Sequence, residues 1–288
     1  MRTILAVFLA AGLAATSFAQ DSASQGQPAQ TQPQTQPAQA QPQGQPADAA
    51  PMAIPEPPQV PAIPVPDMPI VKRTELPGGI IAEDMKIGEG YEVPAHGVVV
   101  AHYHGTLKEG GKVFDSSFQR GEPIAFPLDG VIKGWQDGVP GMKVGGIRRL
   151  TIPAALGYGD QGAGEAIPPK ADLVFVIQLV DALQIIDEKV GEGEPAALQC
   201  LPATAHTVTG TDGKEIEKVD AKTPYIWLPG EWEPIQFGVV GMKVGGKRKL
   251  IVPKEMNQTP PQLQSARPSN VPVTVEIELL GLRNLPRR

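Results

Sequence analysis

The sequence has one cysteine, few aromatic residues and no cluster of basic residues. Of the 288 residues, one is Cys and 5% are Phe, Trp or Tyr, and the formal net charge is −6. A single cysteine excludes an internal disulfide, and a net-acidic chain attracts phosphate backbones poorly. No apolar run reaches the roughly 20 residues that a membrane-spanning helix needs. We therefore expect no nucleic-acid partner, no stable membrane insertion and a core held together by packing alone.

The first nineteen residues have the pattern of a secretory signal peptide. A short basic start is followed by an apolar run of twelve residues, 4–15, and then by Ser-Phe-Ala at 17–19, which is a small-x-small cleavage site. An uncleaved membrane anchor is the alternative, but the run is short for one. The pattern predicts a signal peptide at 1–19, cleavage after Ala19, and a periplasmic or secreted protein.

A segment rich in proline and glutamine follows the signal peptide. Residues 20–69 contain 13 Pro and 12 Gln and no aromatic residue. Such a composition buries too little apolar surface to offset chain entropy, so we expect a disordered linker over 20–73. A proline-rich ligand for an aromatic groove on a partner is the alternative interpretation.

Beyond Leu76, Val, Ile, Phe and Tyr return in short runs separated by Gly, Pro and Asp. The runs 97–103, 147–153 and 173–180 predict strands, and few stretches between them have a helical period. These runs therefore predict an antiparallel sheet protein with little helix.

An internal repeat divides this region. GMKVGGIRRLTIP at 141–153 matches GMKVGGKRKLIVP at 241–253 with nine identities in 13 positions. The same offset of 100 aligns 175–179 with 275–279. Two copies of one unit of about 105 residues lie end to end, and we place the domains at 74–183 and 184–288. Two copies indicate a duplicated domain and not a solenoid.

The first copy resembles a known enzyme family. It contains, in order, HYHGTL, VFDSS, VIKGW, GMKVGG, LGYG and IPPKADLVF. In spacing and residue type these motifs resemble the FKBP family of peptidyl-prolyl cis-trans isomerases. The resemblance implies an α+β fold of two tandem FKBP-like domains, each a curved antiparallel sheet wrapped around one short helix. In the first copy that helix is expected near 133–139, ending before Pro140.

The resemblance also implies a set of site residues. Catalytic roles fall on Tyr103, Asp115, Trp135 and Tyr158. Substrate-binding roles fall on the apolar residues that match the family's pocket, which are Phe114, Phe126, Val131, Ile132, Ile167 and Phe175.

Several of these residues have a more specific expected role. The Tyr158 hydroxyl and the Ile167 backbone N–H are implied to hold substrate carbonyls. Asp115 matches the family's pocket acid, with Arg120 as a partner that keeps it ionised. The alternative for Asp115 is a turn residue before two serines, and for Phe126 and Phe175 it is an ordinary place in the core.

The reaction that this family catalyses makes and breaks no covalent bond. Rotation about an X-Pro amide crosses a barrier of about 20 kcal/mol, and an apolar pocket favours the less polar twisted form over the planar, charge-separated amide. We therefore expect no cofactor and no metal site. Unfolded or proline-containing client proteins are the implied partners, together with macrolide inhibitors. The alternative function is a non-enzymatic periplasmic chaperone that only binds such clients.

Two features qualify the resemblance. Ile124 and Ala166 stand where the family often has larger pocket residues, so the pocket is expected to be wider and macrolide affinity lower. Other motifs are assigned to structure: a hairpin turn is expected at 141–146, and the three histidines 96, 102 and 104 are not expected to bind metal.

The second copy is predicted to have lost the site. We align the residue pairs Tyr103 with Val208, Phe114 with Ile216, Asp115 with Glu217, Trp135 with Ile235, Tyr158 with Gln258, Ile167 with Arg267 and Phe126 with Trp227. Its apolar residues Ile226, Trp227, Leu228, Trp232 and Ile235 are expected either to form an exposed patch for clients or to fill the core or dock the two domains together.

Overall fold

The computed structural model describes residues 63–258 and 269–285. The predicted signal peptide and the predicted linker up to residue 62 lie outside these ranges. The described end of the predicted linker is attached to the first copy, because Ile63 N donates to Phe118 O at 2.9 Å. The first strand begins at Lys72, since its backbone pairs with the next strand. Regular structure therefore starts two residues before the expected boundary at 74.

The first copy contains seven strands and two short α-helices in the described residues. The strands are β1 (Lys72–Leu76), β2 (Ile80–Lys86), β3 (Val98–Leu107), β4 (Val113–Ser116), β5 (Ile124–Pro127), β6 (Ile147–Ile152) and β7 (Leu173–Lys189). The helices are α1 (Ser117–Arg120) and α2 (Lys133–Gly138), with 3-10 turns η1 (Pro77–Gly79), η2 (Leu128–Gly130) and η3 (Ala154–Leu156).

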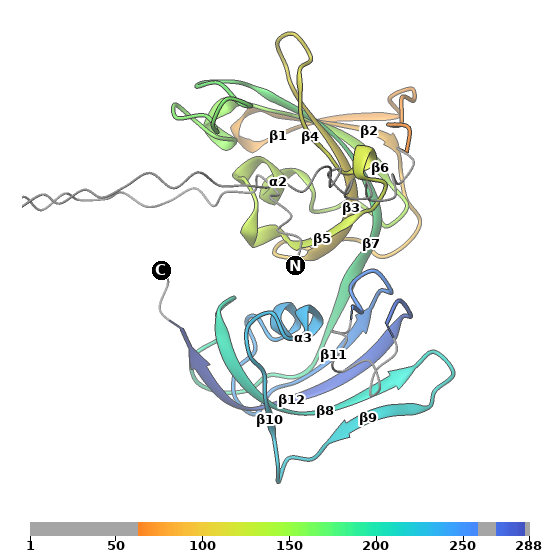
Figure 1. Ribbon diagram of the computed structural model, residues 1–288, viewed down its shortest axis with the longest axis vertical. Coiled ribbons are helices and arrows are strands. Elements are labelled where there is room, and N and C mark those ends of the chain that lie inside the picture. The colour runs from red at the N-terminus through yellow and green to blue at the C-terminus, as the bar shows by residue number, and fades with distance from the viewer. Residues whose placement is uncertain (1–62, 259–268, 286–288) are drawn as a thin grey trace, which may run out of the picture. The chain divides into compact units, whose positions relative to one another are not determined.

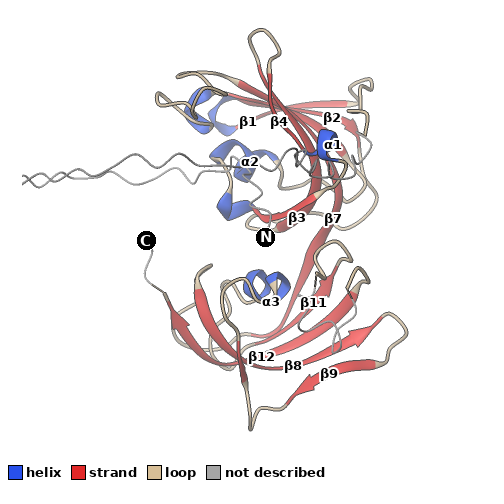
Figure 2. Ribbon diagram, in the orientation of Figure 1, coloured by secondary structure: helices blue, strands red, loops and turns tan. Residues whose placement is uncertain are grey.

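The second copy repeats this order without counterparts of β1 and α1. Its elements are β8 (Cys200–Gly210), β9 (Glu215–Val219), β10 (Tyr225–Ile226), α3 (Glu233–Gly238), β11 (Lys247–Val252) and β12 (Val273–Asn284). All strand pairs are antiparallel. In each copy a bent sheet has one helix, α2 or α3, on its inner side (Figures 1 and 2). The predicted FKBP-like fold is thus confirmed.

The strand β7 belongs to both copies. Residues 173–183 pair with β3 and 173–178 with β6, whereas 184–189 pair with β11. The expected domain boundary at 183/184 therefore lies inside one continuous strand. The alternating buried and half-buried residues at the start of β7 put Leu173, Phe175 and Ile177 on the core side of the first sheet.

Glycine allows the helix of the first copy to lie close to its sheet. A Cβ on Gly134 would come within 2.3 Å of an Ile152 side-chain carbon, and one on Gly138 within 2.7 Å of Leu150. Because α2 packs directly on β6, the neighbouring Trp135 is driven into the core, where it is fully buried. The helix ends at Gly138, one residue from its expected end.

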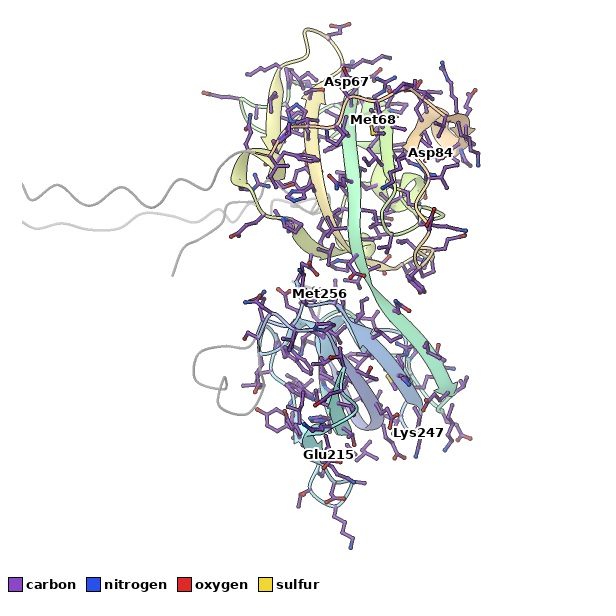
Figure 3. The ribbon with its side chains drawn as sticks, turned by 90° about the vertical axis from the view of Figure 1, so that its right-hand side faces the viewer. Asp67, Met68, Asp84, Glu215, Lys247 and Met256 are labelled. Carbon is purple, nitrogen blue, oxygen red and sulfur yellow. The ribbon has the colours of Figure 1, made fainter. Side chains whose placement is uncertain are left out.

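An arginine at the same place in each copy ties helix to sheet. Arg148 on β6 binds Asp84 on β2 (labelled in Figure 3) at 2.6 Å, and its Nη1 donates to Gly138 O at 2.8 Å. Arg248 on β11 binds Asp187 at 2.7 Å and Gly238 O at 2.7 Å. Both arginines therefore hold a carbonyl at the C-terminal end of the short helix, where a cation is favourable.

Candidate functional site

Trp135 lies at the centre of an aromatic cluster built from four elements. Its ring meets the rings of Tyr103 on β3, Phe126 on β5 and Phe175 on β7, with centroid separations of 5.8, 5.3 and 5.3 Å. All three contacts are edge-to-face, the arrangement that aromatic quadrupoles favour. Helix α2 thus supplies the floor of the site and three strands supply its walls.

A hydrogen-bonded group of three side chains adjoins this cluster. The Tyr103 hydroxyl donates to Asp115 Oδ2 at 2.5 Å, and Arg120 donates to Asp115 Oδ1 at 2.5 Å and to the Tyr103 oxygen at 2.8 Å. The Arg120 guanidinium also lies 5.5 Å from the centre of the Tyr103 ring. Asp115 is therefore not only a turn residue, because it lies on β4 and faces the aromatic cluster through Tyr103.

The two tyrosines of the site keep their protons well into alkaline conditions. Burial, together with the hydrogen bond to Asp115, raises the pKa of Tyr103 far above its usual value. Burial and the negative charge of Asp115 also raise the pKa of Tyr158. Since a neutral phenol donates a hydrogen bond, Tyr158 remains a donor over the physiological pH range.

The backbone N–H of Ile167, which was expected to bind a substrate carbonyl, has a partner within the protein. The side chain of Ile167 is buried in the same hydrophobic core as the aromatic cluster, but its N–H donates to Ala163 O at 3.2 Å. This bond closes the loop between η3 and β7, so Ile167 does not offer that donor to a substrate. The backbone N–H of Ile132, by contrast, donates to no residue that the structure describes. Ile132 precedes α2 and touches the cluster, so it replaces Ile167 as the candidate donor.

The remaining predicted residues surround the cluster. Phe114 meets Phe175 edge-on at 5.5 Å, above Gly105, where a Cβ would approach both rings to within 3 Å. Val131, Ile124 and Ala166 are half-buried and pack against the same core. Ile124 and Ala166 thus lie beside the aromatic cluster, and the wider pocket stays a prediction.

The arrangement suits a ligand with an apolar ring and an adjacent carbonyl. The walls are aromatic and aliphatic, and the polar groups are few: the Tyr158 hydroxyl, the Ile132 N–H and the Asp115 carboxylate held by Tyr103 and Arg120. Such a site can bind and orient an X-Pro amide in an environment of low polarity.

Comparisons with known proteins give the same family. The family model described as FKBP-type peptidyl-prolyl cis-trans isomerase matches residues 90–180. A probable FK506-binding protein of Corynebacterium glutamicum is 47% identical over 106 residues, which are 37% of this chain and 89% of that protein. The chain belongs to the FKBP-type peptidyl-prolyl cis-trans isomerases. The FK506-binding protein of Neisseria meningitidis serogroup B is 48% identical over 105 residues, 36% of this chain and 95% of that protein. A peptidyl-prolyl cis-trans isomerase structure from Pseudomonas syringae shares 39% identity over 38% of this chain and 80% of its own, with a TM-score of 0.36.

Strand register fixes which residues of the two FKBP-like copies are equivalent. Tyr103 lies opposite Ile177, and His206 lies opposite Ile277, so the equivalent of Tyr103 is His206. The sequence alignment of Tyr103 with Val208 is therefore wrong by two residues. Divergent sequence could not place the gaps between copies, whereas hydrogen-bonded register does.

Register supports other pairs of that alignment. Gly105 lies opposite Asp115 and Val208 lies opposite Glu217, so Glu217 is the equivalent of Asp115. His206 Nε2 is 3.2 Å from Glu217 Oε1, which reproduces the Tyr103–Asp115 contact with a different pair. Phe126 lies opposite Val99 on β3, and Trp227 N donates to O of Pro202 on β8, which is the equivalent of Val99 when His206 is the equivalent of Tyr103. Trp135 and Ile235 are both third in their helices. Arg267 lies outside the described residues.

Tryptophans fill the inner side of the second sheet. Trp227 and Trp232 are at most 1% exposed, and their rings lie 5.8 Å apart in a core that also contains Ile235 and Met256. For these residues the core alternative is correct. Ile226 and Leu228, in contrast, are 59% and 60% exposed. Only this pair remains as an exposed apolar surface from the five residues considered.

The three histidines of the first copy contact other side chains, and Cys200 is buried. His102 and His104 contact the hydroxyls of Ser117 and Ser116, and His96 contacts Asp129. Burial raises the pKa of the Cys200 thiol to about 11, which leaves it protonated and unreactive at neutral pH. In the parts of the chain that the structure describes, no helix is long and apolar enough to cross a membrane.

Proposed function

We propose that the first copy, residues 74–183, carries the whole isomerase activity and that the second copy is not catalytic. The aromatic cluster around Trp135, with the Tyr103–Asp115–Arg120 group beside it, is the observation that carries this proposal. The equivalent place in the second copy is filled by its own tryptophans and has Ile235 in place of Trp135.

The residues act by stabilising the twisted amide of the transition state more than the planar ground state, which lowers the barrier between the cis and trans forms. The proline ring lies against Trp135, where loss of water removes the advantage of the charge-separated planar amide. The Ile132 N–H and the Tyr158 hydroxyl hold carbonyls on either side of the bond. The Asp115 carboxylate, held by Tyr103 and Arg120, stabilises the carbon end of the twisting carbonyl. A combined preference of about 5 kcal/mol for the twisted form corresponds to an acceleration of about 10⁴.

The substrates are proline-containing segments of exported proteins. The signal-peptide pattern at 1–19 supports a periplasmic or secreted location, and X-Pro isomerisation is slow enough to limit folding there. Intact-mass measurement of exported protein should give a mature chain that begins at Gln20. A mature chain that begins at Met1 would contradict this location.

An isomerisation assay on a tetrapeptide with a central X-Pro bond tests the activity. The full-length protein is expected to accelerate the reaction, and Tyr158→Phe is expected to lower kcat/KM. A macrolide such as FK506 should inhibit, but at higher concentration than in relatives with larger residues at 124 and 166. Binding of the peptide without acceleration would instead support the alternative function, a client-binding chaperone.

The role of the second copy is tested by comparing two substrates. Full-length protein and a 63–183 fragment are assayed on the tetrapeptide and on a protein whose refolding is limited by proline. A client-binding role for the second copy requires the full-length protein to be faster on the refolding protein alone, because a tethered second surface raises the effective concentration of the catalytic copy. Equal rates of both proteins on both substrates would make the second copy purely structural.

A further inference from the structure

A cleft beyond the aromatic cluster is not used by any residue of the proposed mechanism. It has a volume of about 440 Å³ and lies between the end of β3 and the segment that precedes β7. Its lining includes Leu107, Lys108, Pro168, Pro169, Ala171 and Asp172. Both prolines are exposed, and Leu107 and Ala171 are half-buried against the core that contains the catalytic aromatics.

The cleft lies on the same face of β3 as the catalytic cluster. Side chains alternate along a strand, so Tyr103, Gly105 and Leu107 point to the same side. The Phe114 and Phe175 rings cover Gly105, which places Leu107 just beyond them. Four residues of extended strand span about 13 Å, which is therefore the approximate separation of the cleft from Tyr103 along β3.

The opposite wall also continues from the catalytic site. Ile167 is 1% exposed within the catalytic core, and Pro168 and Pro169 of the cleft follow it directly. Backbone hydrogen bonds hold this wall in place: Lys170 N donates to Gly159 O, and Lys108 N donates to Asp172 O, both at 2.9 Å. Because Gly159 follows Tyr158, the cleft wall is attached to the loop that carries the catalytic hydroxyl.

The backbone at Lys170 is held in an unfavourable conformation. Its φ is +61°, in the left-handed region that a lysine rarely adopts. In the second copy, Asn270 has a φ of +59° at the corresponding position, and asparagine tolerates this region. The second copy also has Gly210 opposite Val273 where the first has Leu107 opposite Leu173. The apolar floor of the cleft therefore belongs to the catalytic copy alone.

The chemistry of the cleft favours an apolar side chain over a charged one. Leu107, the two prolines and Ala171 supply apolar surface. Of the two acids in the lining, Glu109 is exposed, and Asp172 already accepts from Lys108 Nζ at 3.1 Å and from Ala154 N at 3.0 Å. The hydrogen bond from Lys108 lowers the pKa of Asp172, so the pair stays ionised and internally neutralised. Glu109 and Lys170, the other charged residues of the lining, are exposed to water and opposite in sign, so a ligand with a single charge would gain little here.

We propose that this cleft binds an apolar side chain of the substrate about four residues away from the isomerised proline. The occupant is an extended client segment, which advances about 3.3 Å per residue and so reaches the cleft from the catalytic cluster in four steps. The inference rests on the proposed function, because it extends the same substrate along the same strand face. Contact so far from the twisting amide is equal in the ground and transition states, so it lowers KM and leaves kcat nearly unchanged.

Extended peptides test the proposal on the full-length protein. One pair extends the tetrapeptide by four residues on the N-terminal side and a second pair does so on the C-terminal side. Within each pair the outermost residue is Leu or Ser. On one of the two sides, Leu should raise kcat/KM about tenfold over Ser through KM, as expected for burial of a leucine side chain. Equal values for Leu and Ser on both sides would overturn the proposal.

Two matched variants locate the effect. Pro169→Glu places a charge in the cleft at an exposed position and should abolish the difference between Leu and Ser peptides. Ile87→Glu places the same charge at another exposed apolar residue, 59% exposed and outside the cleft, and should preserve it. A difference that survives Pro169→Glu would contradict this location. If Pro169→Glu fails to fold, shown by its thermal unfolding, the peptide series on the unchanged protein still decides.

The two proposals fail in different ways. If the tetrapeptide itself is not turned over, the proposed isomerase function fails. If the tetrapeptide is turned over and neither extension matters, only the cleft proposal fails.

Discussion

In the first copy, Gly105 on β3 lies opposite Phe175, and in the second copy Val208 on β8 lies opposite Val275. The glycine leaves room for the Phe114 and Phe175 rings, whereas the valine, 1% exposed, occupies that room itself. A second pair of unequal size precedes the helix, where the first copy has Ile132 and the second copy has Trp232, which is buried. The two copies therefore fill one frame with differently distributed side-chain volumes: the first places large rings over Gly105, and the second places Trp232 beside its helix.

The polar group shows a parallel difference. The first copy joins Tyr103, Asp115 and Arg120, and its aspartate faces the aromatic cluster. In the second copy His206 contacts both Glu217 and Thr204, and Thr204 accepts from the Trp227 indole at 2.9 Å. The second network thus links a core tryptophan to the polar side chains at the matching positions.

The exchange at Gly105 predicts the largest effect. In full-length protein, Gly105→Val should lower kcat/KM more than a hundredfold, because a Cβ there lies within 3 Å of both phenylalanine rings and would displace them. The matched change Val208→Gly should destabilise the second copy by about 2–4 kcal/mol and leave tetrapeptide turnover unchanged. Peptide assays with chemical unfolding measure both. Turnover by Gly105→Val at the parent rate would show that the rings need no space at this position.

The paired arginines predict a large difference in stability. Arg148 and Asp84 are each 11% exposed, whereas Asp187, the partner of Arg248, is 56% exposed. Arg148→Met should cost about 3–5 kcal/mol, because it leaves a buried carboxylate without its cation. Arg248→Met should cost less, about 1–3 kcal/mol, since water can solvate Asp187. Urea unfolding of the two variants tests this, and equal losses would contradict the burial argument.

The acidic residues predict a smaller, catalytic difference. Asp115→Asn keeps the shape of the group and removes its charge, and should lower kcat/KM about tenfold with little loss of folding stability. Glu217→Gln is the matched control in the second copy and should leave tetrapeptide turnover unchanged. If both variants keep the parent rate, Asp115 has only a structural role.

The smallest of the predicted effects is a loss of folding stability of the first copy at alkaline pH. The pKa of Tyr103 is raised by burial and by Asp115, and that of Tyr158 by burial and by the charge of Asp115. Both phenols therefore stay protonated in the folded chain when the unfolded chain loses its protons, above about pH 10. Their stabilisation is complete below pH 10 and declines above it, by about 1 kcal/mol between pH 10 and 11 for Tyr103.

The control for this pH effect is Tyr103→Phe. Its free energy of unfolding should fall less steeply than that of the parent protein between pH 9 and 11. Parallel curves for the two proteins would mean that Tyr103 does not contribute to the pH dependence.

The sequence by itself determined the duplication, the α+β class, the helix near residue 133 and the residues of the aromatic cluster. The duplication and the sheet follow from local patterns, which are a repeat at a constant offset and period-2 alternation in strands such as β3. The helix and the aromatic residues follow from the resemblance of short motifs to those of the FKBP family. The aromatic residues of the first copy were recognisable because large apolar side chains at motif positions have few other places to go than a core or a pocket.

Only the tertiary structure decided which residues are equivalent and which polar groups are already engaged. Strand register identified His206 as the counterpart of Tyr103. A hydrogen bond within the loop occupies the Ile167 N–H, whereas the Ile132 N–H donates to no residue that the structure describes. The tertiary structure also showed that β7 serves both copies and that a cleft lies beyond the aromatic cluster. The physical reason is that backbone pairing and close packing join segments far apart in the chain, such as Asp84 with Arg148. Their partners depend on how the whole chain folds and not on the residues beside them.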